Sequence, residues 1–232
     1  MRKILFILIL LSMFIFGCNY NCIIGSDNEI SEDRSVSSFS SVSLDGSGNI
    51  YITQDGTTSV RVETDDNIMP NVITKVFGDK LTISTKQCYT GEVDVYLTMN
   101  EIKDLTISGS GKIIGETPIK TDELKLKISG SGLYNIDVEA NKVETLIEGS
   151  GKLYLKGKTD NFNHKVSGSG NLFAYDLDAN SVKIGIYGSG NSQVTANNIL
   201  DATIMGSGNV NYKGTPKVSF DGSGSGKLRS AE

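Results

Sequence analysis

The chain has 232 residues and a net charge of −5, which becomes −7 when the two basic residues of its first 17 positions are set aside. This acidic balance argues against nucleic acid or an anionic lipid surface as a partner. Hydrophobic residues make up 38% of the chain and are regularly placed, which excludes disorder through low hydrophobicity. Short runs of Tyr, Val, Ile and Thr alternate with Gly, Asn, Asp and Ser, as in strands and turns. We therefore expect an all-β protein.

The N-terminus has the features of an export signal. Arg2 and Lys3 precede an apolar run that ends at Phe16, and this run is shorter than the about 20 residues of a membrane helix. We expect residues 1–17 to be a signal peptide. The following Cys18 stands where the bacterial lipobox has its lipidated cysteine; ordinary secretion, with Cys18 incidental, is the alternative. We expect a lipid anchor as the only contact with the membrane, on the outer membrane or cell surface rather than the inner membrane.

Residues 18–34 are polar and acidic with little periodicity, and we expect them to form a flexible, lipid-anchored stalk. With Cys18 lipidated, Cys22 and Cys88 remain. In an oxidising compartment they could form a disulfide that ties the stalk to the domain, or stay as two free thiols. The sequence leaves both possibilities open.

The rest of the chain, residues 35–232, carries an internal repeat. The tripeptide Gly-Ser-Gly begins at Gly46, Gly109, Gly130, Gly149, Gly168, Gly188, Gly206 and Gly222. Most intervals are close to 19 residues, and the first, of 63, is about three times as long, so we expect degenerate coils between residues 49 and 108. A fixed period of this kind is typical of repeat architectures.

Apolar residues recur at every second position before each tripeptide. Two residues before it stand Leu44, Ile107, Ile128, Ile147, Val166, Ile186, Ile204 and Phe220. Alternation resumes after it, so one coil is a strand, a Gly-Ser-Gly corner, a second strand and a polar turn. Such short strands bury their apolar face only when coils stack. We predict a parallel β-helix-like solenoid with coils of about 19 residues.

The corner tripeptide has a structural explanation. Glycine permits positive φ and close approach of neighbouring corners, and the central serine could form a ladder of stacked hydroxyls. A serine nucleophile is a poor alternative, because the chain has a single histidine and eight copies do not make one active site.

Several segments together resemble the head GIN domain family, whose members are described as auto-transporter adhesins. The similar segments are residues 36–42, 44–46, 49–52, 66–70, 78–83 and 101–111. The resemblance covers about residues 35–230. It implies a β-helix-like fold on exported, often lipid-anchored bacterial proteins, and it supplies no catalytic residues.

Candidates for chemistry are few, and we expect no catalytic residue, metal or cofactor. His164 lies in an inward column, so we expect a core residue with a local hydrogen bond rather than a metal ligand. Asp45 and Asp221 precede corners, but the calcium-binding nonapeptide of β-rolls is absent. A glycosidase would need a pair of carboxylates in a cleft, but the acidic residues do not gather at one height of the rod to mark such a site.

The third residue after each tripeptide forms an outward column. It contains Tyr51, Ile114, Asn135, Tyr154, Phe173, Gln193, Asn211 and Lys227. Tyr154 and Phe173 are one coil apart, and we expect Tyr175 to point the same way. These three residues are the predicted ligand-binding site; the alternative is that their rings only stabilise the sheet.

We therefore expect a non-catalytic adhesin or ligand-binding module of the cell envelope, with a glycan or a surface protein as its ligand. One alternative is a scaffold or sensor of envelope components. The other is a carbohydrate-active enzyme, since solenoids of this kind can host polysaccharide chemistry.

Overall fold

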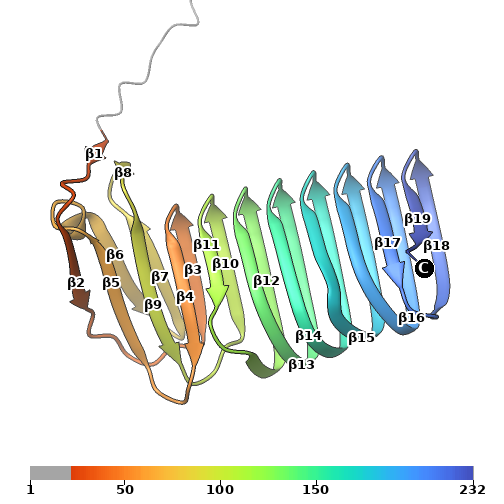
Figure 1. Ribbon diagram of the computed structural model, residues 1–232, viewed down its shortest axis with the longest axis horizontal. Coiled ribbons are helices and arrows are strands. Elements are labelled where there is room, and N and C mark those ends of the chain that lie inside the picture. Colours follow the sequence, from red (N-terminus) through yellow and green to blue (C-terminus); the bar gives the residue numbers. More distant parts are fainter. Residues whose placement is uncertain (1–21, 232) are drawn as a thin grey trace, which may run out of the picture.

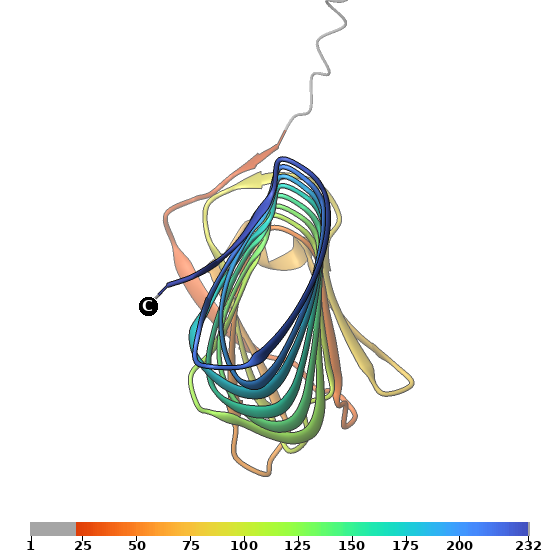
Figure 2. The same ribbon diagram turned by 90° about the vertical axis from the view of Figure 1, so that its right-hand side faces the viewer.

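The computed structural model describes residues 22–231, which form a rod of stacked β-strands (Figure 1). Seen along its axis, the rod has a flattened cross-section with two sheet faces, a narrow corner at one edge and a wider bend at the other (Figure 2). The predicted all-β solenoid is confirmed. Residues 1–17 and Cys18 lie outside the described residues, so the signal peptide and the lipid anchor stay predictions.

The regular part of the rod consists of long strands that each run around the wide bend. They are β12 (Ile119–Gly130), β13 (Leu133–Gly149), β14 (Lys152–Gly168), β15 (Asn171–Gly188) and β16 (Asn191–Gly206). Neighbouring strands are parallel, and each corner glycine stands in register with the next, as Gly149 does with Gly168. Alternate residues are buried on both faces, because inward side chains of successive coils meet in the core.

Shorter strands complete the two faces. The pre-corner face, whose strands lead into the corners, also contains β3 (Ser41–Gly46), β7 (Lys80–Thr85), β10 (Asp104–Gly109) and β18 (Lys217–Gly224). The post-corner face, whose strands leave the corners, also contains β4 (Asn49–Gln54), β9 (Val93–Met99), β11 (Lys112–Gly115), β17 (Asn209–Lys213) and β19 (Lys227–Ser230).

The two glycines of a corner serve different purposes. Gly149 has φ +128°, and a Cβ there would lie 2.4 Å from the carbonyl oxygen of Gly130 in the preceding coil. Gly151 has no positive φ; a Cβ there would lie 2.7 Å from Cγ2 of Ile128. At this corner the tolerance of glycine for positive φ is therefore used at the first position, while the second glycine leaves room for a core side chain.

Main-chain hydrogen bonds connect successive corners. The amide of Ser150 donates to the carbonyl of Gly130 at 2.9 Å, and that of Ser169 donates to Gly149 at the same distance. The predicted bond between stacked hydroxyls is present where Ser225 donates to Ser207 at 3.0 Å. The serine main chain, rather than its hydroxyl, therefore makes the contact that recurs from corner to corner.

The last corner differs from the prediction by two residues. Gly206 stands in register with Gly224, not with Gly222, so the corner is residues 224–226. Phe220 consequently continues the column of Ala202, four residues before the corner. On the post-corner face, Arg229 rather than Lys227 follows the outward column.

The long first interval does not contain coils stacked in chain order. Gly46 pairs directly with Gly109, so β3 and β10 are neighbours across 63 residues of sequence. The intervening chain forms one further coil, β7 and β9, on the other side of β3 and β4. Beyond it, β5 (Ser59–Asp65) and β6 (Val72–Phe77) run antiparallel to β9 and β7, joined by the 3-10 turn η2 (Met69–Asn71). Buried Ile68 and Met69 close this end of the core.

The segment expected to be a flexible stalk is attached to this cap. Strand β2 (Glu29–Asp33) pairs antiparallel with β5, and β1 (Ile23–Ile24) pairs with β8 (Tyr89–Thr90). A disulfide joins Cys22 to Cys88, which decides between the two possibilities left open above. The boundary predicted at residue 35 is therefore too late, because β2 extends the sheet by main-chain pairing and the disulfide holds the start of the described chain.

Candidate functional site

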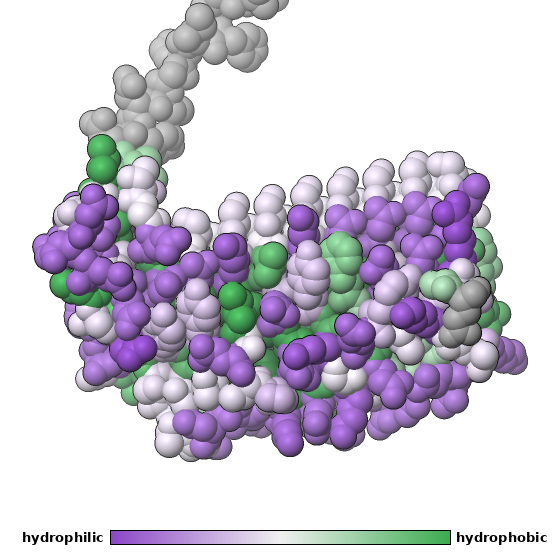
Figure 3. Space-filling view, viewed as in Figure 1, coloured by the Kyte–Doolittle hydropathy of each residue, from purple (hydrophilic) through white to green (hydrophobic). Residues whose placement is uncertain are grey.

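The predicted outward column is continuous along the post-corner face and longer than expected. In stacking order, this column, called here the aromatic row, contains Tyr96, Tyr51, Ile114, Asn135, Tyr154, Phe173, Gln193, Asn211 and Arg229. Tyr96 was missed from sequence because its coil has no Gly-Ser-Gly corner. Figure 3 shows this face, with hydrophobic surface in the middle of the rod between hydrophilic margins.

Two aromatic pairs stack within the row. The rings of Tyr154 and Phe173 are 4.7 Å apart between centroids with an interplanar angle of 11°, and those of Tyr51 and Tyr96 are 5.0 Å apart. The guanidinium of Arg61 lies 4.6 Å from the Tyr96 ring centroid and covers that pair. Each stacked ring covers one face of the other, and the row continues beyond their outer faces with Asn135 and Gln193, so Tyr154 is 39% exposed and Phe173 is partly buried.

Tyr175 faces the same surface as Phe173, as alternation along the strand predicts, and a β-bulge adds a second outward residue beside it. Tyr154 pairs with Phe173, but Lys156 pairs with Asp176, so β15 holds one extra residue between these two pairs. Inward positions therefore pass from Ala174 to Leu177, and both Tyr175 and Asp176 face outward.

Neighbouring coils hold the bulge in place. The Thr195 hydroxyl donates to the Tyr175 carbonyl at 2.7 Å, which satisfies a main-chain acceptor that the bulge takes out of the ladder. The ammonium of Lys213 lies 4.7 Å from the Tyr175 ring centroid. Partial burial raises the pKa of Tyr175, so its phenol remains protonated at neutral pH and can donate a hydrogen bond.

The three predicted residues line one depression of about 260 Å³. Its walls are Asn135, Tyr154, Leu155, Lys156, Phe173, Tyr175, Asp176 and Gln193. Aromatic surface, two amides, an ammonium and a carboxylate thus converge on a hollow beside the bulge. Such a mixture can contact the apolar face of a small ring and hydrogen-bond to its hydroxyls.

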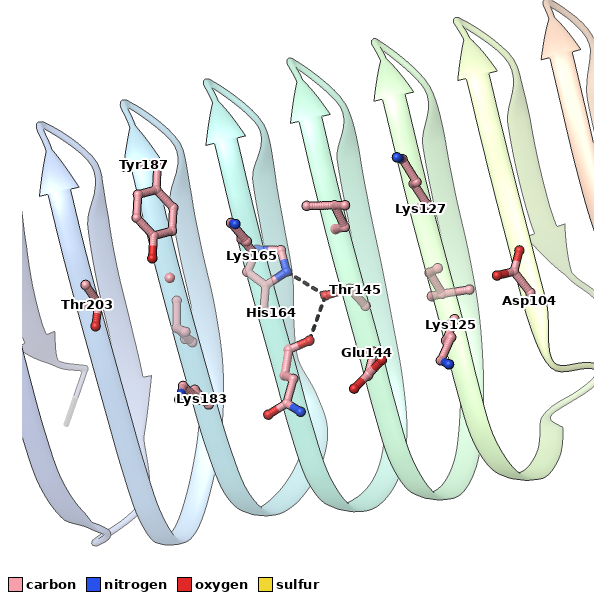
Figure 4. A pocket seen from close by; sticks show the side chains of 15 residues that line it. Asp104, Lys125, Lys127, Glu144, Thr145, His164, Lys165, Lys183, Tyr187 and Thr203 are labelled. Carbon is pink, nitrogen blue, oxygen red and sulfur yellow. Dashed lines mark hydrogen bonds between the residues drawn. The ribbon is translucent and has the colours of Figure 1, made fainter.

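A larger hollow of about 450 Å³ lies on the opposite, pre-corner face (Figure 4). Leu146 and Gly185 occupy outward positions where the neighbouring coils have Lys or Thr, and Tyr187 bounds the hollow on one side. Its charged lining consists of Lys125, Lys127, Lys165, Lys183, Asp104 and Glu144. This hollow was not predicted from the sequence, although a leucine and a glycine at outward positions of a polar column were the available signal.

His164 lies in the core beneath this face, as predicted. Its Nδ1 is 2.6 Å from the Thr145 hydroxyl oxygen, and its ring stacks with that of Phe162. Burial lowers the pKa of His164 to about 3, so the imidazole is neutral at physiological pH. Its Nε2 has no hydrogen-bond partner, and within residues 22–231 no group of three or more His, Cys, Asp or Glu side chains could hold a metal ion.

The carboxylate of Asp45 accepts a hydrogen bond from the Ser43 hydroxyl at 2.9 Å. Asp221 belongs to β18 and does not precede the last corner. No helix within residues 22–231 is long and apolar enough to cross a membrane.

Comparisons with solved structures return the same architecture. A "putative adhesin" from Bacteroides fragilis NCTC 9343 is 26% identical with a TM-score of 0.85, covering 90% of this chain and 99% of that one. A "putative lipid binding protein" from Parabacteroides distasonis ATCC 8503 is 24% identical with a TM-score of 0.75 and the same coverage. A "putative adhesin" from Parabacteroides merdae ATCC 43184 is 23% identical with a TM-score of 0.71, again covering 90% and 99%.

Comparison with curated proteins gives no match. The family model described as "Putative auto-transporter adhesin, head GIN domain" matches residues 38–216. This span runs from just before β3 to the residue before β18, and so includes the aromatic row from Tyr96 to Asn211. The resemblance of the individual motifs is thereby confirmed, and the chain belongs to the head GIN domain family.

Proposed function

We propose that this protein is a non-catalytic, exported adhesin that binds a saccharide in the depression beside Tyr154, Phe173 and Tyr175. The observation that carries the proposal is the bulge in β15. Tyr175 faces outward by alternation after Phe173, and the extra residue turns Asp176 outward beside it, so that three aromatic rings and a carboxylate border one hollow. Bulges are frequent next to functional sites, where they re-aim a side chain.

The chemistry of the lining favours a sugar over a flat apolar ligand. The exposed part of an aromatic ring can contact the apolar face of a saccharide, while Asn135 and Gln193 supply amide donors and acceptors. Lys156 and Asp176 add a charged donor and acceptor at the margin. Family membership supports an adhesin in the coarser sense, and the basic-apolar-Cys18 order at the N-terminus supports export and lipid anchoring at the cell surface.

The test is a glycan array probed with the chain beginning at Asn19. We expect the triple substitution Tyr154→Ser, Phe173→Ser, Tyr175→Ser to abolish binding to those glycans on the array that the wild-type protein binds. The matched control is Tyr51→Ser with Tyr96→Ser, which removes the other stacked pair of the aromatic row but leaves the depression intact. Circular dichroism confirms that both variants fold. Unchanged binding by the triple variant, or equal loss in the control, would contradict the proposal.

A second candidate function is favoured by the hollow on the pre-corner face. Its lining combines apolar surface at Leu146 and Tyr187 with the ammonium groups of Lys125, Lys165 and Lys183. A small anionic amphiphile, such as a long-chain carboxylate, would place its chain on the apolar surface and its head at the lysines. The related structure described as a lipid-binding protein is in keeping with this possibility.

Calorimetry with laurate tests this second candidate. Leu146→Asp introduces a charge into the hollow, and we expect it to abolish laurate binding. Thr82→Asp introduces a carboxylate in the same outward column but away from the hollow, and should leave binding intact. Dodecyl maltoside, which has the chain but no anionic group, should bind more weakly than laurate. Equal binding of both detergents would rule out a role for the lysines.

A further inference from the structure

The two ends of the rod are finished differently. The N-terminal end carries η2 and the antiparallel strands β5, β6 and β2. At the opposite end, β18 pairs with β16, and all eight β18 residues are exposed (Figure 1). Val218 and Phe220 stand in register with buried Leu200 and Ala202, but they are 40% and 47% exposed. The inward column therefore reaches solvent at an open strand edge, which is a template for pairing with another strand.

The N-terminal cap of another copy is a poor occupant for this edge. Its outermost strand, β2, has the sequence EISED, with three acidic residues, and all five residues are exposed. Charged edge strands of this kind prevent head-to-tail association. The occupant must instead offer a strand with apolar residues at alternate positions.

Strand β18 is complementary to itself. If two copies of β18 pair antiparallel about a two-fold axis at Ser219, Val218 of one copy faces Phe220 of the other. In the same register, Lys217 faces Asp221 of the second copy on the outer side of the sheet. Apolar side chains then meet apolar side chains in the core, and each lysine meets a carboxylate.

We propose that two copies of this protein associate end to end through β18, forming an antiparallel strand pair centred on Ser219. The pairing satisfies the open main-chain edge and buries Val218 and Phe220 of both copies. It is independent of the saccharide site proposed above, because it uses neither the depression nor the aromatic row within it.

The dimer has a consequence for adhesion. The chain enters the rod at the capped end, opposite β18 (Figure 1). The two copies of β1 therefore lie at opposite ends of the dimer. With Cys18 lipidated, such a dimer would join two membranes, so the second copy would be the adhesion partner.

Cysteine cross-linking tests the register. In the chain beginning at Asn19, Cys22 and Cys88 are joined, so a single introduced cysteine reports on pairing. We expect Ser219→Cys to give a disulfide-linked dimer in high yield on mild oxidation, because each Ser219 faces its counterpart. Ser223→Cys, on the same exposed strand, should stay monomeric because it faces a different residue. No dimer from Ser219→Cys, or equal yields from both, would overturn the proposal.

Charge reversal gives a second, reversible measurement by sedimentation equilibrium. Lys217→Glu and Asp221→Lys each place like charges opposite one another, and each should weaken self-association about tenfold. Mixing the two variants restores opposite charges at both contacts, so the heterodimer should regain wild-type affinity. Both residues are exposed, and the fold should not change. Wild-type association in each single variant, or no recovery on mixing, would contradict this register.

Discussion

The carbonyl oxygen of Gly130 lies 2.4 Å from the place where a side chain on Gly149 would begin. The contact repeats between successive corners, as for Gly168 over Gly149 at 2.5 Å. Because the obstructing atom belongs to a backbone that is itself fixed by the coil below, it cannot move away as a flexible side chain could. The close spacing of successive coils therefore requires glycine at the first position of these corners.

Gly149→Val should therefore destabilise the fold by about 3 kcal/mol or more, because it adds a β-branched residue at positive φ to a clash with backbone. Ser150→Ala should change the free energy of unfolding by no more than about 0.5 kcal/mol. Its side chain is exposed, and its amide keeps the bond to Gly130. Urea unfolding of both variants measures the difference, and similar losses would mean that the serine hydroxyl stabilises the corner as much as the glycine.

The disulfide should stabilise the N-terminal cap. It joins Cys22 and Cys88 across 66 residues, so the double substitution to serine frees a long loop in the unfolded chain. We expect a loss of about 2–4 kcal/mol, measured as a lower urea midpoint. Reductant should produce the same shift in the wild type and none in the double variant. If reductant still lowered the urea midpoint of the double variant, the loss of stability would not come from the Cys22–Cys88 disulfide.

The fold and the position of the aromatic pair were predictable because one tripeptide carries the period. Once the corners are aligned, alternation alone determines which residues face inward, and Tyr154 and Phe173 follow as neighbours. The last corner was misplaced because residues 222–226 contain two overlapping copies of the tripeptide. Continuing the preceding interval of 18 residues would have selected Gly224, which is the register observed.

The cap and the bulge could not be located in the same way. Residues 55–103 lack the tripeptide, and their strands reverse direction, so no periodic alignment can place them. The interval from Gly168 to Gly188 is 20 residues rather than 19, which shows that this coil holds one residue more. Its position next to Tyr175 depends on how the neighbouring strands pair, as does the hollow around Leu146 and Gly185.

Lipidation of Cys18 remains a prediction with a direct test. Cys18→Ser should abolish processing at the bond before residue 18 and release the protein from the membrane fraction, because cleavage and acylation both depend on the thiol. Several acyl chains give stable anchoring, whereas one gives only marginal binding. Metabolic labelling with a fatty acid and membrane fractionation measure the two effects. A variant that is still cleaved at this bond and still firmly membrane-bound would disprove the assignment.

His164 should make the stability of the domain depend on pH in a defined window. Its pKa falls from 6.5 to about 3 on folding, because burial disfavours the charged imidazolium. The unfolded chain therefore binds a proton that the folded chain does not, between these two values. The contribution of the neutral His164 to the free energy of unfolding is fully present above pH 6.5. It decreases by about 1.4 kcal/mol per pH unit as the pH falls toward 3.

Replacement of His164 by leucine removes this pH dependence. The leucine side chain fills the same inward position, next to Ile184 of the following coil. Between pH 7 and pH 5 the wild type should lose about 2 kcal/mol more than His164→Leu, measured by urea unfolding at both values. The comparison cancels the titration of the carboxylates, which both proteins share. Thr145, whose hydroxyl contacts Nδ1, supplies the control: Thr145→Val should lower stability at both values but retain the slope, because the imidazole stays buried. A parallel pH dependence in wild type and His164→Leu would mean that the imidazole is accessible to protons in the folded state.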